Sequence, residues 1–461
     1  MIMIEINLNE MLKITEGVLI NPSVNILFNR IEIDSRKVDP KAYFMPILGE
    51  VHDGHKFILN AFEAGVQIAF CERAYYYANQ EALKDLTLIL VDNTTKTLHR
   101  ISKYILEKTG VQTIGITGSV GKTSTKEFVY HVLKNKYSVH KNKGNFNNHI
   151  GMPLTIFDLT MEHELAVLEM GMNHFKEIEV LAEIARPHVA VVTNIGTSHI
   201  GILGSRENIF QAKMEITSYL RDEDTLIIHE EDNFLKRIGS TSFKTLRIGS
   251  DMTISRVLMK EDGCFTYDFN YKGCHPVELN VLGKHNIINS ALAIAVGIEM
   301  GVEVSDACKL VSDFVETNKR LEILQGKKGS SIISDCYNAS QESMISAIDV
   351  LNNYEGKTIA ILGDVLELGD FSKISHEAVG EYLAAHPMDM LMTFGKDSEY
   401  IKLKAESLGY DHAYHFSDID ALYEFIDKHL DSSTILVKGS FGMGMSRIVD
   451  FLGGKHENNL S

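Results

Sequence analysis

The chain has 461 residues, of which 44% are hydrophobic and 23% are charged, and its formal net charge is −17. This length corresponds to about three globular domains at roughly 150 residues each. The acidic balance excludes non-specific binding to DNA, RNA or anionic membranes, because all of these carry the same sign of charge.

The cysteines and the N-terminal stretch indicate the compartment. The five cysteines show no C-x-x-C spacing, which is typical of reduced thiols in the cytosol. The stretch MIMIEINLNEMLKI has no basic region followed by an apolar one. No apolar run reaches the roughly 18 residues that span a bilayer. We therefore expect a cytoplasmic protein without nucleic-acid partners or membrane insertion.

The hydrophobic pattern divides the chain into three regions. Residues 1–108 mix short strand-like runs with helical pieces such as HKFILNAFEAGV. In residues 109–316, strand-like VQTIGITG, LAVLEMG and VAVVTNI alternate with helical KTSTKEFVYHVLKN, HFKEIEVLAEIA and RENIFQAKMEITSYL, and LGKHNIINSALAIAVGIEM predicts a helix near a domain junction. In residues 317–461, strand-like SIISDCYN, KTIAILGDV, MLMTFG and STILVKGS each precede a helical stretch. This order predicts an α/β fold of three domains: a small N-terminal one, a central P-loop-type domain with a mainly parallel sheet, and a Rossmann-like C-terminal one.

The stretch GITGSVGKTS, between a buried strand and a helix, predicts a phosphate-binding loop. Gly118 and Gly121 allow backbone N–H groups to approach phosphate oxygens, and the helix N-terminus adds positive potential. Lys122 can bridge two phosphates, and the Thr123 hydroxyl can ligate Mg²⁺. An ordinary glycine-rich turn is the alternative, but strand, G-x-x-G-K-T-S and helix in succession favour nucleotide binding.

Three further side chains are candidates for metal binding. Glu169 closes LAVLEMG and His199 follows VAVVTNI, so both lie at the carboxyl ends of parallel strands, beside the loop. Each could instead be a capping or surface residue. Lys213 borders an apolar helical face, where partial desolvation would favour its neutral, nucleophilic form. A lysine whose ammonium reaches solvent is the alternative.

The compressed spacing T-G-x-x-G-K-[ST] resembles the loop of the Mur ligases, ATP-dependent amide-forming enzymes of peptidoglycan precursor synthesis. The resemblance implies that Lys122, His199 and Lys213 are catalytic. It implies that two Mg²⁺ ions are bound by Thr123, Glu169, His199 and a carbamate on Lys213. It also implies that a carboxylate substrate is activated by ATP as an acyl phosphate, which the incoming amine then attacks.

Matching motifs extend over nearly the whole chain and assign further binding roles. KGNFNNHIGMPLT and IDSRKVDPKAYF resemble segments that bind the UDP-sugar substrate, and LGKHNIINSALA and NKRLEIL resemble segments that bind the nucleotide. The resemblance implies UDP-substrate contacts from Ser35, Arg36, Asn145, Asn147 and Asn148. It implies ATP contacts from Gly118, Ser119, Val120, Gly121, Lys122, Thr123, Ser124, Asn286, Asn289, Arg320, Asp335 and Asn338. Residues 1–108 would bind the UDP-sugar, 109–316 ATP, and 317–461 the incoming amino compound.

Two C-terminal segments, ISDCYNASQESM and ILGDVLELG, resemble the branch of the family that adds D-alanyl-D-alanine. That branch implies UDP-N-acetylmuramoyl-tripeptide and D-alanyl-D-alanine as substrates, and we expect a monomer. Phe441 and Ser446 stand where the family pattern has arginine and glutamate. A paralogous ligase with another amine or carboxylate therefore remains an alternative, as does a nucleotide-binding regulatory protein without ligase activity.

Overall fold

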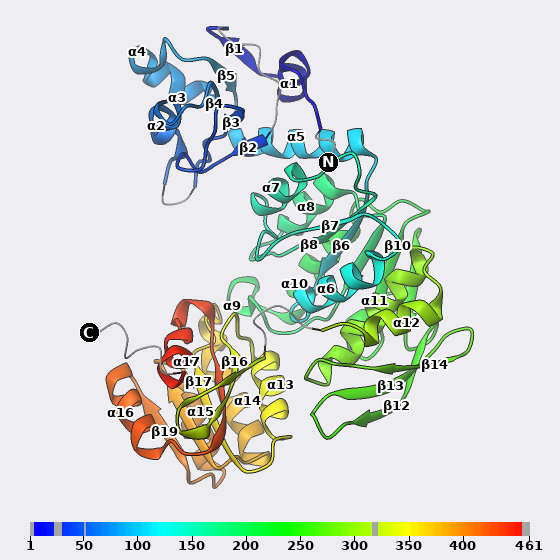
Figure 1. Cartoon of the computed structure of the whole chain (residues 1–461), viewed down its shortest axis with the longest axis vertical. Helices are drawn as coiled ribbons and strands as arrows, with labels where there is room; N and C mark the ends of the chain where they lie inside the picture. The colour runs from blue at the N-terminus through cyan, green and yellow to red at the C-terminus, as the bar shows by residue number, and fades with distance from the viewer. Residues whose placement is uncertain (1–3, 23–29, 50–51, 316–320, 454–461) are drawn as a thin grey trace.

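The computed structural model describes residues 4–22, 30–49, 52–315 and 321–453. Figure 1 shows three α/β parts in chain order, with the N-terminal part at the top, the central part in the middle and the C-terminal part at the bottom. This arrangement confirms the predicted α/β fold of three domains with mainly parallel sheets. In the described ranges, no helix combines the length and the apolar character needed to cross a membrane.

The N-terminal sheet has the strand order β1-β5-β4-β3-β2, and every pair in it is parallel except β1 with β5. Its strands are β1 Val18–Ile20, β2 Arg30–Glu32, β3 Ala42–Phe44, β4 Ile68–Glu72 and β5 Leu88–Val91. Its shorter helices are α1 Leu8–Thr15, α2 Ile58–Glu63, α3 Arg73–Ala78 and α4 Gln80–Leu83, with a 3₁₀ turn at Gly54–Phe57. Helix α5, Thr94–Thr109, leads into the central part and ends at Gly110, whose φ of 66° suits glycine.

The central sheet has the order β11-β10-β9-β6-β8-β7 and is parallel throughout. Its strands are β6 Gln112–Thr117, β7 Val139–Lys141, β8 Leu165–Glu169, β9 Val189–Val192, β10 Thr225–His229 and β11 Lys244–Ile248. Its helices are α6 Lys122–Leu133, α7 Gly151–Phe157, α8 Glu177–Ala185, α9 Ile200–Leu203, α10 Arg206–Met214, α11 His285–Glu299 and α12 Val304–Ser312. Because helices cover both faces, β8 and β9 read as nearly continuous apolar runs, whereas β6 is largely buried although its sequence QTIGIT includes two threonines.

The helix predicted over RENIFQAKMEITSYL is shorter than its pattern indicates. It ends at Met214, and a 3₁₀ turn follows over Glu215–Thr217. The Glu215 carboxylate accepts hydrogen bonds from the backbone N–H groups of Lys176 (2.8 Å) and Glu179 (3.2 Å) at the start of α8. The turn thus satisfies N–H groups that have no partner within α8.

A small antiparallel sheet that the sequence reading missed follows the central strands. It consists of β12 Thr253–Met259, β13 Phe265–Asn270 and β14 Cys274–Glu278, in that order. A signal was present, because FTYDFN alternates aromatic and polar residues with the period of a strand. Lys272 and Gly273, with φ values of 50° and 135°, make the turn to β14.

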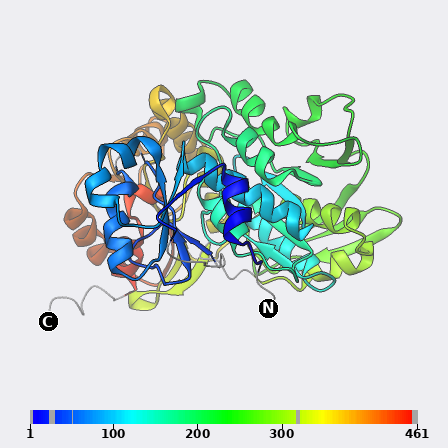
Figure 2. The ribbon, with the colours of Figure 1, turned by 90° about the horizontal axis from the view of Figure 1, so that it is seen from above.

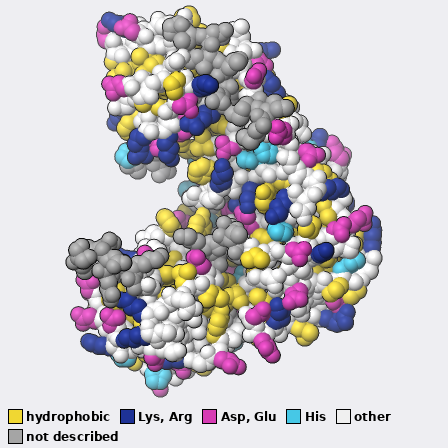
Figure 3. All heavy atoms as spheres, in the orientation of Figure 1, with side chains coloured by type: hydrophobic (Ala, Val, Ile, Leu, Met, Phe, Trp, Pro, Cys, Tyr) yellow, Lys and Arg dark blue, Asp and Glu magenta, His cyan; other side chains and the backbone are white. Residues whose placement is uncertain are grey.

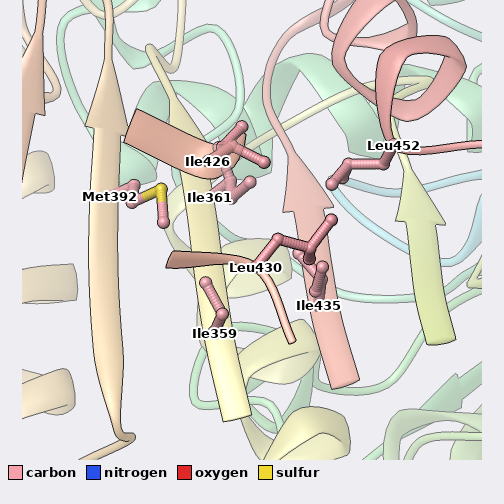
Figure 4. A pocket seen from close by; sticks show the side chains of 7 residues that line it. All are labelled: Ile359, Ile361, Met392, Ile426, Leu430, Ile435 and Leu452. Carbon is pink, nitrogen blue, oxygen red and sulfur yellow. The ribbon is translucent and has the colours of Figure 1, made fainter. Parts of the chain in front are cut away.

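The C-terminal sheet has the order β15-β16-β20-β17-β18-β19, with only β15 antiparallel. Its strands are β15 Glu322–Gln325, β16 Ser331–Asp335, β17 Lys357–Gly363, β18 Met390–Phe394, β19 Ala413–Phe416 and β20 Ser433–Lys438. Its helices are α13 Gln341–Leu351, α14 Ser372–Ala385, α15 Glu399–Ser407, α16 Ile419–His429 and α17 Ser446–Leu452. Figure 4 shows apolar side chains of β17, β18 and β20 packed against α16 and α17, which closes one face of this sheet.

The three parts enclose a broad hollow. Figure 3 shows it between the N-terminal and C-terminal parts, with the central part as its wall. Lys and Arg side chains gather on the edge of the N-terminal part that borders it. In the view from above (Figure 2), the N-terminal part lies over the C-terminal part, and the central part lies beside them. Elements from all three parts therefore surround one open space.

Candidate active site

The predicted phosphate loop connects β6 to α6, and both of its glycines are required by close packing. Gly118 has a φ of 148°, and a Cβ there would lie 1.8 Å from the Thr193 hydroxyl oxygen. Gly121 has a φ of 85°, and a Cβ there would lie 2.5 Å from the side-chain oxygen of Asn289. The loop is tied to the segment after β9, because Gly196 N–H donates to the Ser119 hydroxyl at 2.8 Å.

Lys122 and Thr123 begin helix α6, directly after the loop. The Lys122 ammonium donates to the Gly118 carbonyl at 2.8 Å, so it reaches back across the loop. The Thr123 hydroxyl donates to the Glu169 carboxylate at 2.9 Å. Val120 N–H donates to the Asn194 side chain at 3.0 Å. Ser124, the last predicted loop residue, is buried within α6.

Glu169 supplies a buried carboxylate beside the loop. It closes β8, it is 3% exposed, and it accepts hydrogen bonds from Thr123 and from the Asn147 side chain (2.8 Å). A hydroxyl and a carboxylate are hard oxygen donors, which Mg²⁺ prefers. Among the described residues, no three side chains of His, Cys, Asp or Glu gather to hold a metal ion. Thr123 and Glu169 would supply two oxygen ligands to a magnesium ion, and a nucleotide phosphate would supply others.

Lys213 is more deeply buried than its sequence pattern predicts. Its residue is 2% exposed, and no hydrogen bond or ion pair joins its ammonium to any residue that the structure describes. Burial, together with the nearby charge of Lys122, lowers the pKa of Lys213 well below its ordinary value. The neutral amine is thus favoured at a position near the phosphate-loop lysine.

His199 lies at the start of α9, where the central part meets the C-terminal part. Its neighbour Ser198 donates to the Ser119 carbonyl of the phosphate loop at 3.3 Å. The His199 ring turns the other way, with Nδ1 2.9 Å from the Glu367 carboxylate. That contact lowers the pKa of Glu367, and the hydrogen bond to His199 is the main cause. No hydrogen bond or ion pair between described residues joins His199 to Glu169.

A second carboxylate of the C-terminal part holds the same segment. Glu342 accepts from Thr197, at 2.7 Å from the backbone N–H and 3.0 Å from the hydroxyl. Gly201 packs against the backbone of Leu368 and Gly369. The segment that borders the phosphate loop is therefore also the docking surface for the C-terminal part.

We expect the substitution Gly201→Ala to loosen this docking. The added methyl group would lie 2.3 Å from the carbonyl carbon of Leu368, so the two backbones must separate. Hydrogen exchange measured by mass spectrometry should become faster in residues 197–203 and 367–371. Gly239→Ala is the matched control, because nothing lies within 4 Å of a Cβ at that position. Unchanged exchange in the Gly201 variant would contradict the docking role.

The predicted substrate asparagines occupy the segment between β7 and α7. Asn147 binds Glu169, as described above, and its carbonyl accepts from Gly171 at 2.8 Å. The Asn148 side chain accepts from Gly151 N–H at 2.7 Å and so helps to start α7. Asn145 is exposed. Asn147 thus directly contacts the candidate metal ligand, whereas Asn148 has a local structural partner.

Asn286 and Asn289, two of the predicted ATP contacts, are buried behind the loop. Asn289 donates to the Asn286 side chain at 3.0 Å, and Asn286 donates to the Leu282 carbonyl at 2.8 Å. The Asn289 oxygen also accepts from the Thr125 hydroxyl at 3.3 Å. These contacts brace α11 against α6 and the Gly121 turn, and both asparagines are buried.

The remaining candidates lie in the outer parts of the molecule. Arg36 pairs with Asp34 at 2.8 Å, which lowers the pKa of Asp34, and Ser35 lies between them. Asp335 pairs with the buried Lys438 at 2.5 Å, and Lys438 also donates to the Asn338 carbonyl at 3.0 Å. Arg320 lies outside the described residues.

Comparisons with known proteins agree along the whole chain. The model of the Mur ligase family catalytic domain matches residues 28–104, that of the Mur ligase middle domain 116–297, and that of the Mur ligase glutamate ligase domain 319–441. The chain is 38% identical over 451 residues to the UDP-N-acetylmuramoyl-tripeptide–D-alanyl-D-alanine ligase of Bacillus subtilis strain 168, covering 96% of both chains. The chain belongs to the Mur ligase family.

Solved structures of Mur ligases agree in fold. MurF from Acinetobacter baumannii superposes with a TM-score of 0.89 at 28% identity, over 98% of this chain and 100% of that one. MurF ligase from Thermotoga maritima in complex with ADP superposes with a TM-score of 0.81 at 28% identity, over 93% of this chain and 98% of that one. The match extends over all three parts shown in Figure 1.

Sequence reasoning missed several residues of this Mur ligase that contact the candidate site. Lys126 lies one helical turn beyond Lys122, and that spacing places both on one side of α6. Asn142 follows β7 at the edge of the sheet, and because β7 reads VHK, no apolar run marks the position. Glu342 and Glu367 come from the C-terminal part, and no sequence pattern connects them to the phosphate loop.

Proposed function

We propose that this chain is an ATP-dependent ligase that joins D-alanyl-D-alanine to UDP-N-acetylmuramoyl-tripeptide, a step of peptidoglycan precursor synthesis. The observation that carries the proposal is the loop itself: Lys122 spans a turn closed by two obligatory glycines, and Thr123 contacts the buried Glu169. The similarity to D-alanyl-D-alanine-adding ligases over 96% of the chain supports the choice of substrates.

The reaction needs an activated carboxylate, because a free carboxylate is a poor electrophile. The peptide carboxylate attacks the γ-phosphorus of ATP, the bond to the ADP oxygen breaks, and an acyl phosphate forms. The amine of the dipeptide then attacks the acyl carbon, and phosphate leaves while the amine loses a proton. Lys122 and the loop N–H groups orient the phosphates and offset their charge. Closure of the hollow excludes water from the acyl phosphate.

Thr123 and Glu169 would hold magnesium, and His199 would join them once its ring is released from Glu367. Bound magnesium supplies positive charge next to the transferring phosphoryl group. Residues 109–316 carry this chemistry in the proposal. Residues 1–108 bind the UDP-sugar, and residues 317–461 bring in the dipeptide.

Lys213 carries a carbamate in this proposal. Its neutral amine attacks CO₂, a nitrogen–carbon bond forms and one proton is released, which leaves an anionic carboxylate-like group. Burial without a hydrogen-bond partner among the described residues supports this modification, because it lowers the pKa of the amine. The resulting anion would face the charge of Lys122 and add an oxygen ligand for a second magnesium ion.

A product assay tests the proposed function. Purified protein is supplied with UDP-N-acetylmuramoyl-tripeptide, ATP and D-alanyl-D-alanine, and the ligated product, ADP and phosphate are measured. The three products should form in equal amounts. Absence of ADP release with this pair would count against the proposal.

One observation favours a second candidate, a ligase of the same chemistry with another amine. The Phe441 side chain is 75% exposed, and its ring lies 6.5 Å from that of Tyr337 at the ends of β20 and β16. An exposed aromatic pair cannot bind a carboxylate as an arginine does. A panel of dipeptides and amino acids separates the two candidates, because D-alanyl-D-alanine should give the highest kcat/KM if the first one holds.

A further inference from the structure

The main chain of Glu169 is held by a single buried side chain, that of Asn142. Asn142 is 1% exposed, and its oxygen accepts from Glu169 N–H at 2.9 Å. Its nitrogen donates to the Glu169 carbonyl at 3.0 Å and to the Phe146 carbonyl at 2.9 Å. One amide therefore contacts both backbone groups of the candidate metal ligand and fixes its position at the end of β8.

The side chain of Glu169 faces a second buried group, the Lys126 ammonium. Lys126 is 2% exposed; its nitrogen lies 3.7 Å from the Glu169 carboxylate and 3.5 Å from that of Glu127. It also donates to the Asn142 carbonyl at 3.0 Å. The same lysine thus contacts Glu169 and the residue that clamps the Glu169 backbone. Lys141 continues the ion pairs outward through Glu127, and no ion pair or hydrogen bond between described residues joins it to Glu169.

These contacts have a common effect on a buried carboxylate. A carboxylate removed from water is stable only if charges and hydrogen bonds replace its hydration. Lys126 and Thr123 both contact the Oε2 atom of Glu169, and Asn142 contacts its backbone. These contacts hold the carboxylate in one orientation, with its Oε2 atom next to both Thr123 and Lys126.

We propose that Asn142 and Lys126 are positioning residues for the ligation reaction. Asn142 fixes the backbone of Glu169, and Lys126 fixes the carboxylate that meets the cation beside the phosphate loop. We call this pair the Glu169 brace. The inference rests on the proposed function, and it adds two residues that act through Glu169.

Binding of Mn²⁺ in the presence of ADP tests the brace without ligation. Free Mn²⁺ is followed by electron paramagnetic resonance in titrations of the full chain. Asn142→Ala and Lys126→Met should each weaken Mn²⁺ binding by about tenfold or more, the usual effect of removing a group that orients a metal ligand. Lys126→Arg, which keeps the charge, should recover part of the affinity. Lys141→Met removes the ion pair with Glu127 and the contact over the Tyr130 ring, neither of which involves Glu169, and it should bind Mn²⁺ as the unmodified chain does.

Ligation kinetics and circular dichroism complete the test. The brace predicts that kcat falls while KM for the UDP-substrate stays nearly constant, in variants whose circular dichroism matches that of the unmodified chain. If Lys126 merely neutralised charge, Lys126→Met would bind Mn²⁺ more tightly, and that result would overturn the proposal. Unchanged affinity in both variants would overturn it as well, with the ligase function intact. Failure of the unmodified chain to bind Mn²⁺ with ADP would overturn both the brace and the proposed function.

Discussion

The substitution Lys122→Ala is expected to lower the rate of ligation by about 10³-fold, the scale of losing a positive group at a transferring phosphoryl. The Lys122 ammonium lies across the loop, 2.8 Å from the Gly118 carbonyl, so its position is set by the start of α6. Without the ammonium, the negative charge that develops on the phosphoryl oxygens is stabilised only by backbone N–H groups and the metal cation. The measurement is ADP formation under saturating substrates.

Matched lysine variants make that experiment specific. Lys134 directly follows the same helix and is exposed to solvent, so Lys134→Ala should keep the unmodified rate. Lys122→Arg retains the charge, but its planar guanidinium does not fit the same turn, so its rate should also stay low. A rate near that of the unmodified chain in Lys122→Ala would refute the role given to this lysine.

The loop and its strands could be predicted because their signals are local. A strand buried on both faces reads as a continuous apolar run, which is why β8 and β9 are recognised in the sequence. Strand β6 is recognised by its β-branched residues before the glycine of the loop. Gly118 and Gly121 are explained by close contacts to Thr193 and Asn289, but their spacing already indicates a turn that approaches phosphate. Pattern and packing therefore agree at the phosphate loop.

The partners of the site could not be predicted because they come from distant segments. Thr197 donates a hydrogen bond to Glu342, which lies 145 residues further along the chain, and His199 contacts Glu367, which lies 168 residues further along. Periodicity reports which face of a helix is apolar and says nothing of what covers it. For that reason Lys213 was expected at the border of an apolar face, whereas the structure buries it completely.

Lys213 gives the second large effect, because activity and stability should change in opposite directions. Lys213→Met should abolish measurable ligation and raise the free energy of unfolding by about 1–3 kcal/mol, the range for removing an uncompensated buried polar group. Urea unfolding of both proteins without bicarbonate measures this increase in the free energy of unfolding. A lysine with a purely structural role would lose stability on substitution, since methionine retains only its apolar stem.

The stability gain should depend on pH with a definite sign. The pKa of Lys213 is lowered in the folded chain, so the unfolded chain binds more protons between the folded and unfolded pKa values. Below the lowered pKa the unmodified chain therefore carries its full penalty, which shrinks as the pH rises toward the ordinary lysine pKa. The advantage of Lys213→Met should accordingly be larger at pH 6 than at pH 9. An advantage that grows with pH would contradict a buried amine at this position.

Chemical rescue distinguishes the carbamate from the amine itself. Lys213→Ala leaves a space in which a short carboxylic acid can supply the anionic oxygens that a carbamate would provide, so acetate or propionate should restore part of the ligation rate. Short amines of the same size should restore none. The unmodified enzyme should lose activity when CO₂ is removed and regain it with bicarbonate. Rescue by amines, or full activity without CO₂, would show that Lys213 acts as a lysine and carries no carbamate.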